Sequence, residues 1–380
     1  MTTLKVFHLI TGLQVGGAER TLLEVVPRLN GERFQHSIWS LTTMGPVATP
    51  LQRLGLPVHA LGFGGRNSLP AAARLAAAIR QERPTILHSH MTHANIAARL
   101  ASRIVRPPVV ICAERNSGAW KSTRLVRFER MIAGWADWHT AVSLSVADFL
   151  VKHQGVPAER VSVIRNGVAL PAAVSAERRL EVRDALGVGA GGKLVLSVGR
   201  VVPQKGYEHL IRAIPLVRQS VPEARFFVAG DITRRKYDDY RAMLSALAAE
   251  LNVSEHVRFL GVRDDVVLLL ASADLFVMSS IWEGLPNVLL EAMAAGVPAV
   301  TTDVDGGGEV GRMARAAVMV PAEDPEALAG GMLRLLENPA EAQERAAAGL
   351  ELVRSEFTWD GTALATRELY EDLLRAKGIT

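Results

Sequence analysis

The chain has 380 residues, of which 49% are hydrophobic, 22% charged and 5% aromatic, and its formal net charge is +4. This length exceeds one ordinary core, so two domains are expected. The single cysteine, Cys112, excludes a disulfide framework and favours a reducing cytoplasm. No apolar run reaches the ~18 residues of a membrane span, and the first one is too short for a signal peptide, which predicts a soluble cytoplasmic protein.

Strand-like apolar runs alternate with helical stretches through the first half. The expected strands lie near 4–10, 35–41, 57–61, 85–90, 108–113, 138–142 and 161–164, and the expected helices near 18–29, 69–81, 95–104 and 145–153. Alternation with crossovers of this length predicts a parallel sheet with helices on both faces.

The second half repeats this alternation. Strands are expected at 193–198, 225–230, 256–260, 274–277, 298–301 and 317–320, and helices at 209–218, 238–251, 265–271, 287–295, 326–336, 340–355 and 358–376. The Gly- and Pro-punctuated stretch 166–174 reads as a linker. We therefore expect an N-terminal Rossmann-like domain over 1–168, a second over 169–357, and a C-terminal segment, 358–380, that returns to the first.

The loops that follow the strands are the expected site, because ligands bind beyond the carboxyl ends of parallel strands. Gly16 and Gly17 stand between the first strand and its helix, where backbone N–H groups could approach an anion or simply form a tight turn. His88, His90 and His93 end another strand. Three close histidines suggest a metal site of a hydrolase, and one catalytic histidine, His90, is the alternative.

Two cations follow the first strand of the second half. Gly199 ends the strand, Arg200 and Lys205 come next, and a helix is expected near Gly206. Both side chains bind phosphate well, and fixed cations stabilise a departing diphosphate more than the bound substrate. Two exposed basic loop residues are the alternative.

The most specific segment runs from Ser279 to Pro298. A strand leads to Glu283-Gly284-Leu285-Pro286-Asn287 and then to an apolar helix that contains Glu291. Pro286 suits the first helical turn, and the backbone donors there would point toward an anion. Two carboxylates at this spacing could accept hydrogen bonds from sugar and ribose hydroxyls.

Together these segments resemble glycosyltransferase family 4, whose members are retaining, metal-independent enzymes of the GT-B fold, with two Rossmann-like domains facing across a cleft. The resemblance runs from Gly16 almost to the end, through Trp359. It implies that His90 contacts the transferred sugar, that Arg200 and Lys205 bind the diphosphate, and that Glu283 and Glu291 hold sugar and ribose. The implied catalytic residues are His90, Arg200, Lys205 and Glu283, and the implied donor-binding residues are Gly16, Gly17, Arg200, Lys205, Val262, Arg263, Glu283, Gly284, Leu285, Pro286, Asn287 and Glu291.

Three segments depart from the family pattern. Ala169 replaces the Asp of an Asn-Gly-x-Asp segment, and Ile232 replaces the last Gly of a turn that begins at Gly230-Asp231. The run Asp305-Gly306-Gly307-Gly308-Glu309 is one residue shorter than the family's glycine-rich loop. The shortened loop leaves no role that can be transferred to Glu309.

The expected function is hexose transfer from a UDP- or GDP-sugar to a saccharide or lipid-linked acceptor in cell-surface polysaccharide or glycolipid synthesis, with no cofactor. A sugar-nucleotide 2-epimerase, a histidine-metal hydrolase and a catalytically silent nucleotide-sugar binding protein are the alternatives. No nucleic-acid partner is expected.

The resemblance implies that the N-terminal domain, 1–168, binds the acceptor and that the second, 169–357, binds the nucleotide sugar, and the N-terminal half is basic. Residues 1–170 carry 20 Lys/Arg against 9 Asp/Glu, whereas residues 171–380 carry 23 against 30. Within 115–135, Arg124, Arg127 and Arg130 share one helical face, and Leu125, Phe128 and Ile132 share another. This pattern suits peripheral binding to an anionic membrane such as the inner face of the cytoplasmic membrane, and equally suits a core helix with a solvated cationic face.

Overall fold

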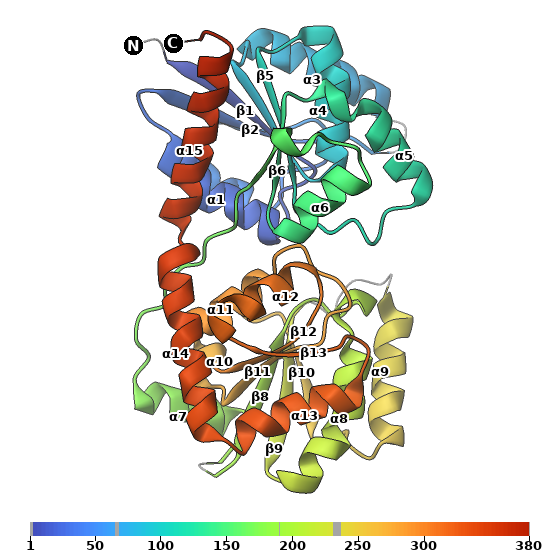
Figure 1. Ribbon diagram of the computed structural model, residues 1–380, viewed down its shortest axis with the longest axis vertical. Coiled ribbons are helices and arrows are strands. Elements are labelled where there is room, and N and C mark those ends of the chain that lie inside the picture. The colour runs from blue at the N-terminus through green and yellow to red at the C-terminus, as the bar shows by residue number, and fades with distance from the viewer. Residues whose placement is uncertain (1–2, 65–67, 190, 231–236, 380) are drawn as a thin grey trace. The chain divides into compact units, whose positions relative to one another are not determined.

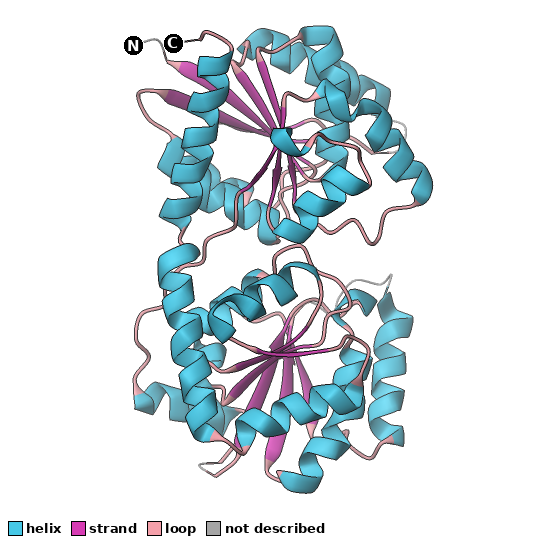
Figure 2. Ribbon diagram, viewed as in Figure 1, coloured by secondary structure: helices cyan, strands magenta, loops and turns pink. Residues whose placement is uncertain are grey.

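Two parallel β-sheets, each in its own unit, organise the computed structural model, which describes residues 3–64, 68–189, 191–230 and 237–379 (Figures 1 and 2). Unit 1 comprises the chain up to Gly167 together with the segment from Trp359 onward, and unit 2 comprises Val168–Thr358. The two-domain parallel α/β fold expected from the sequence is confirmed.

Unit 1 holds a seven-stranded sheet in the order β3-β2-β1-β4-β5-β6-β7. Its strands are β1 (Leu4–Ile10), β2 (Phe34–Ser40), β3 (Val58–Ala60), β4 (Ile86–His90), β5 (Val109–Glu114), β6 (Trp138–Ala141) and β7 (Val161–Val163). Its helices are α1 (Gly17–Leu29), α2 (Ala48–Arg53), α3 (Ser68–Glu82), α4 (Thr92–Val105), α5 (Thr123–Ile132), α6 (Leu144–Lys152) and α15 (Trp359–Ala376).

Unit 2 holds a six-stranded sheet in the order β10-β9-β8-β11-β12-β13. Its strands are β8 (Lys193–Val198), β9 (Ala224–Ala229), β10 (Val257–Gly261), β11 (Leu275–Met278), β12 (Ala299–Thr302) and β13 (Val318–Val320). Its helices are α7 (Ala176–Ala185), α8 (Tyr207–Ser220), α9 (Asp238–Glu250), α10 (Val266–Ser272), α11 (Asn287–Ala294), α12 (Asp305–Arg312), α13 (Pro325–Leu336) and α14 (Pro339–Glu356).

The strand order reverses once in each sheet, between β1 and β4 in unit 1 and between β8 and β11 in unit 2. A crevice opens beyond the carboxyl ends of the strands at such a reversal, because the neighbouring crossovers leave in opposite directions. Ile10 pairs with His90 at the first reversal, and Phe276 pairs with Leu196 near the second. The sequence-predicted loops therefore emerge where each sheet is built to bind a ligand.

Side-chain caps fix several helix starts. Ser143 accepts a hydrogen bond from the amide of Val146 at the start of α6. Asp324 caps α13 in the same way through Ala327, and Pro325 fills the first helical position, where no N–H is needed.

The C-terminal helix α15 belongs to unit 1. Its Tyr370, Leu373 and Leu374 are buried with Leu4 and Phe34 of the first two strands. This apolar face explains why the last segment of the chain completes the first domain.

Helix α12 corrects the prediction of a glycine-rich loop at 305–309. A Cβ on Gly306 would lie 1.9 Å from the carbonyl oxygen of Gly284, and one on Gly307 would lie 2.9 Å from the Met278 side chain. Each glycine lowers the intrinsic helix stability by about 1 kcal/mol relative to alanine. Close backbone packing overrides that preference here.

The predicted turn after Gly230 has no structural outcome. Asp231 and Ile232, in the predicted turn after Gly230, lie outside the described residues. Within the described part of the chain, no helix is both long and apolar enough to cross a bilayer.

Candidate active site

The loop after β8 turns sharply at Gly206. Pro203–Lys205 form one turn of 3-10 helix, and Gly206 has φ 58° at the start of α8. A Cβ at Gly206 would lie 2.3 Å from the carbonyl oxygen of Ser279. Both the left-handed backbone and the close approach require glycine, so this residue brings the β8 and β11 loops into contact.

Hydrogen bonds join these two loops. The Ser279 hydroxyl donates to the carbonyl oxygen of Lys205 at 2.9 Å, and the Ile281 amide donates to that of Gln204 at 2.8 Å. The Gln204 side-chain amide donates to the Trp282 carbonyl at 2.9 Å. Few groups in this contact can move independently, which is what a preorganised site needs.

Lys205 and Glu283 form an ion pair across the two loops, with Nζ 2.5 Å from Oε1. Their side chains are only 13% and 9% exposed. The Ser280 hydroxyl donates to the same Oε1 at 2.7 Å, and the Glu283 amide donates to Asp305 at 3.1 Å. A lysine has three N–H donors, so two can serve a ligand while one holds Glu283.

Arg200 differs from Lys205 in its surroundings. Its side chain is exposed at the end of β8, and it forms no ion pair among the described residues. The neighbouring carbonyl of Gly199 would lie 1.9 Å from a Cβ on Gly230, so β9 approaches this loop through glycine as well. An exposed guanidinium on the same loop as a buried ion-paired ammonium suits capture of a charged ligand.

Helix α11 begins beside the ion pair. Pro286 is its N-cap, directly before Asn287, where the sequence predicted the helix to begin, and no side chain caps it. Gly284, Leu285 and Pro286 are buried, while Asn287 is half-buried. A helix start favours an anion through its dipole and its first amides.

The other predicted donor residues of unit 2 surround this centre less closely. Glu291 is half-buried one turn along α11, among buried Leu290 and Ala292. Val262 and Arg263 are exposed beyond the edge strand β10, and Arg263 forms a bidentate pair with Asp265 at 2.8 and 2.7 Å. That contact raises the pKa of Arg263 and lowers the pKa of Asp265.

The predicted glycine loop of unit 1 has a carboxylate at its helix start. Gly16 is the N-cap of α1, and Glu19 follows in the first turn. Oε2 of Glu19 lies 2.6 Å from where a Cβ on Gly16 would be. An incoming phosphate would have to displace or share this position.

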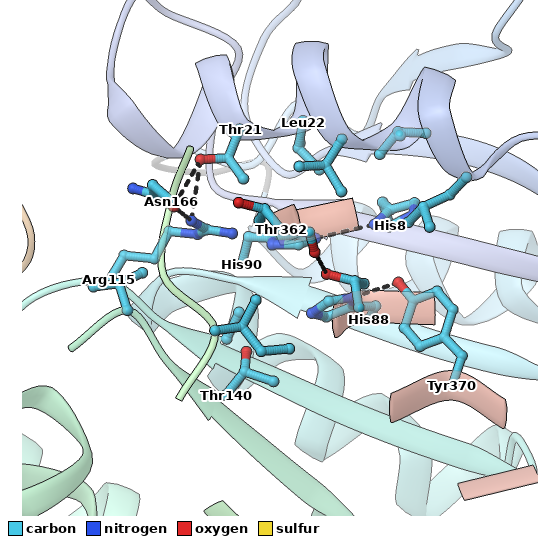
Figure 3. Close-up of a pocket in the computed structure, with 17 residues that line it drawn as sticks. His8, Thr21, Leu22, His88, His90, Arg115, Thr140, Asn166, Thr362 and Tyr370 are labelled. Carbon is cyan, nitrogen blue, oxygen red and sulfur yellow. Dashed lines mark hydrogen bonds between the residues drawn. The ribbon is translucent and has the colours of Figure 1, made fainter. Parts of the chain in front are cut away.

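A buried histidine cluster fills the interior beneath the reversal of the first sheet (Figure 3). Nδ1 of His8 lies 3.0 Å from Nε2 of His90, Nε2 of His8 lies 2.9 Å from Nδ1 of His36, and Nδ1 of His88 lies 2.7 Å from the Tyr370 hydroxyl. A neutral imidazole has one N–H, so His8 donates at one nitrogen and accepts at the other. His90 is thus a buried member of a network, only 2% exposed.

A cavity of about 30 Å³, large enough for about one water molecule, adjoins these rings. Arg115 also lines it and donates to Asn166 at 2.8 Å and to Thr21 at 3.1 Å (Figure 3). Burial lowers the pKa of Arg115 to about 10. Sequence reasoning missed Arg115, Asn166, His8 and His36, because nothing local marks them as neighbours.

The histidines that converge differ from those the metal alternative proposed. Ligand nitrogens of His8, His88 and His90 all lie within 4.8 Å of one another. His93 is exposed on α4 and stacks on Trp120, with ring centroids 6.3 Å apart. The described cavity lining has a guanidinium and no carboxylate, which disfavours a dication. The cluster therefore fits neutral, hydrogen-bonded histidines better than a metal centre.

Comparison with known proteins decides the family. Residues 15–170 match the model of Glycosyltransferase Family 4, and residues 179–350 match that of Glycosyl transferases group 1. The chain is 30% identical over 302 residues to the glycogen synthase of Mycobacterium tuberculosis, covering 77% of this chain and 69% of that protein. The chain belongs to glycosyltransferase family 4.

Other relatives agree with this assignment. The glycosyltransferase is 30% identical over 292 residues to the phosphatidyl-myo-inositol mannosyltransferase of Mycobacterium leprae, covering 75% of this chain and 73% of that one. The fold matches Anabaena Alr3699/HepE, solved in complex with UDP, with a TM-score of 0.86, 22% identity, and coverage of 97% of this chain and 100% of that one. The epimerase and hydrolase alternatives receive no support.

The basic segment of the glycosyltransferase forms a helix whose apolar side is partly internal. Ile132 and Glu129 of α5 are buried, and Lys121 binds Glu114 at 2.7 Å and Glu129 at 3.0 Å with all three side chains at most 1% exposed. Of the expected apolar face of Leu125, Phe128 and Ile132, the last residue packs inward. Ile132 therefore cannot face a lipid surface, and the prediction is wrong at this position. Arg124, Arg127 and Arg130 are exposed, as the helical spacing predicted.

The histidine cluster predicts acid lability of this glycosyltransferase. Burial lowers the pKa of His36 to about 4 and that of His88 to about 3 from an ordinary 6.5. Above pH 6.5 these rings are neutral in both the folded and the unfolded protein. As the pH falls from 6.5 to about 4, only the rings of the unfolded protein take up protons. Each histidine should then lower the free energy of unfolding by about 1.4 kcal/mol per pH unit.

Chemical denaturation between pH 7.5 and 4.5, followed by circular dichroism, measures this slope. His88→Gln should reduce the slope relative to the parent protein, although its stability at pH 7.5 will be lower. Equal slopes in the two proteins would contradict the assignment of buried neutral rings. Comparing the slopes removes the contribution of the carboxylates, which both proteins share.

Proposed function

We propose that this glycosyltransferase transfers a hexosyl group from a UDP- or GDP-sugar to a saccharide or lipid-linked acceptor in cell-surface polysaccharide or glycolipid synthesis, with retention of configuration and without a metal or other cofactor. The observation that carries the proposal is the Lys205–Glu283 pair at the strand-order reversal of unit 2, beside the start of α11. It combines groups suited to a diphosphate and to sugar hydroxyls within one preorganised loop contact.

The donor diphosphate is assigned to Arg200, Lys205 and the start of α11. Cleavage of the sugar–oxygen bond concentrates negative charge on the departing phosphate. An ammonium held in place by Glu283 does not need to reorganise as that charge develops, so it stabilises the transition state more than the ground state. These groups supply the positive charge for which other enzymes use a metal ion.

Glu283 is assigned to the hydroxyls of the transferred sugar, and Glu291 to the ribose. Oε1 of Glu283 already accepts hydrogen bonds from Lys205 and Ser280, so that its lone pairs are engaged and the carboxylate is held in one orientation. That environment favours a carboxylate that orients the sugar over one that attacks the anomeric carbon. Asn287, Leu285 and Gly284 complete the donor site through their backbone.

The proposed reaction is a front-face substitution. The acceptor hydroxyl forms a bond to the anomeric carbon on the face from which the diphosphate leaves, while the bond from that carbon to the phosphate oxygen breaks. The departing nucleoside diphosphate keeps the electron pair of the broken bond and receives the acceptor proton. The products are the glycoside, with the donor configuration, and the nucleoside diphosphate.

The known activities and ligands of similar proteins support the donor and acceptor classes. Anabaena Alr3699/HepE has been solved with UDP-glucose, and an Escherichia coli relative, 23% identical over 321 residues, is a UDP-Gal:alpha-D-GlcNAc-diphosphoundecaprenol alpha-1,3-galactosyltransferase that this chain covers over 80% of its length. Exposed Arg124, Arg127 and Arg130 support peripheral association with an anionic membrane. We retain a sugar contact for His90 and a phosphate contact for Gly16 and Gly17 as predictions.

Removing either cation should impair the chemical step. Arg200→Ala and Lys205→Ala should each lower turnover by about 10²–10³-fold, the effect of losing one preorganised charge-stabilising group. Nucleoside diphosphate release, measured with each sugar nucleotide and a panel of acceptors, gives the rate. Arg212→Ala on the exposed side of α8 is the matched control and should leave turnover unchanged. Full activity in both site variants would refute the donor assignment.

The stereochemical course has its own readout. Proton NMR of the first-formed product from an α-linked donor should show an α-glycoside, and addition of EDTA should leave the rate unchanged because protein cations neutralise the diphosphate. A β-linked product, or an EDTA-inactivated enzyme that Mg²⁺ restores, would contradict the proposed mechanism.

A further inference from the structure

A hydrophobic groove of about 580 Å³ lies between α3 and α4 of unit 1. This volume falls within the ~300–1,000 Å³ typical of small-molecule sites. Its walls are mainly apolar and include Phe63, Ala72, Ala76, Ile96, Leu100 and Ile104. Figure 1 shows both helices in the layer that covers one side of the first sheet.

Alanines on α3 leave the space that forms the groove. Ile79 of this helix is buried in the core, whereas Ala72 and Ala76 line the groove with small side chains beside the buried Leu75. On the opposite wall, Leu100 is 43% exposed and Ile104 is 62% exposed, one helical turn apart. Large apolar side chains gathered beside a groove mark a surface that binds an apolar partner.

The polar end of the groove lies at the carboxyl edge of the sheet. Thr11 follows β1, Thr42 follows β2, and His93 lies in the first turn of α4 after β4. Ligand chemistry is expected at this edge because the strand order reverses between β1 and β4. An elongated apolar ligand in the groove could therefore present a polar head to the acceptor side of the fold.

The helices beside the groove are cationic. α4 contains no acidic residue, and the one acidic residue of α5, Glu129, is buried against Lys121. Arg103 is exposed on α4, and Arg124, Arg127 and Arg130 are exposed on α5. The positive charge of this surface attracts an anionic lipid. It repels a basic protein helix and offers no such attraction to a neutral one.

We propose that the α3–α4 groove binds the hydrocarbon chain of a phosphate-bearing lipid, namely the anchor of the acceptor itself. The chain lies along Ala72, Ala76 and Leu100, and the head group lies at the Thr11, Thr42 and His93 end. This assignment rests on the proposed transfer to a lipid-linked acceptor and gives that acceptor a binding site.

Calorimetric titration of the full-length protein with hexyl, octyl, decyl and dodecyl phosphate, each below its critical micelle concentration, tests the groove. Burial of each added methylene should strengthen binding about three- to fourfold until the groove is filled. Inorganic phosphate should bind at least tenfold more weakly than dodecyl phosphate, on the order of the loss of a few buried methylenes. Affinity independent of chain length would overturn the proposal.

Two alanine variants locate the binding site. Ala76→Leu and Ala97→Leu fill the groove from opposite walls and should weaken dodecyl phosphate binding about tenfold or more, because the added side chains occupy the space of several methylenes. Ala77→Leu makes the same change at an exposed position of α3 outside the lining and should bind like the parent. If all three variants lose the same affinity, or if the first two lose none, the hydrocarbon chain does not lie in this groove.

Donor titrations keep this test separate from the proposed function. UDP and GDP should bind the Ala76→Leu variant as they bind the parent, since Ala76 is none of the residues assigned to the donor. If binding depends on the length of the hydrocarbon chain but no sugar is transferred, the proposed function is refuted and the proposed lipid site in the groove still stands. If Ala76→Leu does not impair transfer to lipid-linked acceptors, the proposed acceptor site in the groove is refuted. Sedimentation showing that this face joins two copies of the chain would also overturn it.

Discussion

The close contact between the β8 and β11 loops of unit 2 is the constraint on which the catalytic account depends. Gly206 permits it, since any Cβ there would meet the Ser279 carbonyl at 2.3 Å. Gly306 permits a similar close approach between α12 and Gly284, because a Cβ on Gly306 would lie 1.9 Å from the Gly284 carbonyl oxygen. With the backbones this close, Lys205 reaches Glu283, and one charge pair joins the loop proposed to bind phosphate to the loop proposed to bind the sugar.

Unit 1 achieves rigidity by a different means. Its sheet reversal contains four buried histidines in place of an all-apolar core. Hydrogen bonds join His8 to His90 and His36, His88 to Tyr370, and Arg115 to Asn166. Buried polar groups are costly unless paired, so the cluster favours one arrangement of β1, β2, β4 and α15. The groove beside α3 differs from this cluster, because small alanine side chains there leave an exposed apolar surface on which we propose that a ligand binds.

The fold could be predicted from the sequence because alternating strands and helices leave a periodic pattern, and both sheets contain the strands that this pattern indicated. The loops around Lys205 and Glu283 could be located because strand ends are visible in sequence. Helix α12 could not, because its glycines favour a loop locally, and the close approach of Gly306 to Gly284 is a tertiary contact that the sequence does not reveal. The burial of His90 could not either, since Tyr370 and His8 reach the cluster from distant segments.

The central claim is that a nucleoside diphosphate binds at the strand-order reversal of unit 2. Hydrogen–deuterium exchange of the full-length protein, with and without saturating UDP or GDP, tests it most directly. Amide exchange should slow in both 199–206 and 284–289, because one bound diphosphate engages the β8 loop and the start of α11 together. Binding that protects neither segment, or only one of them, would contradict it.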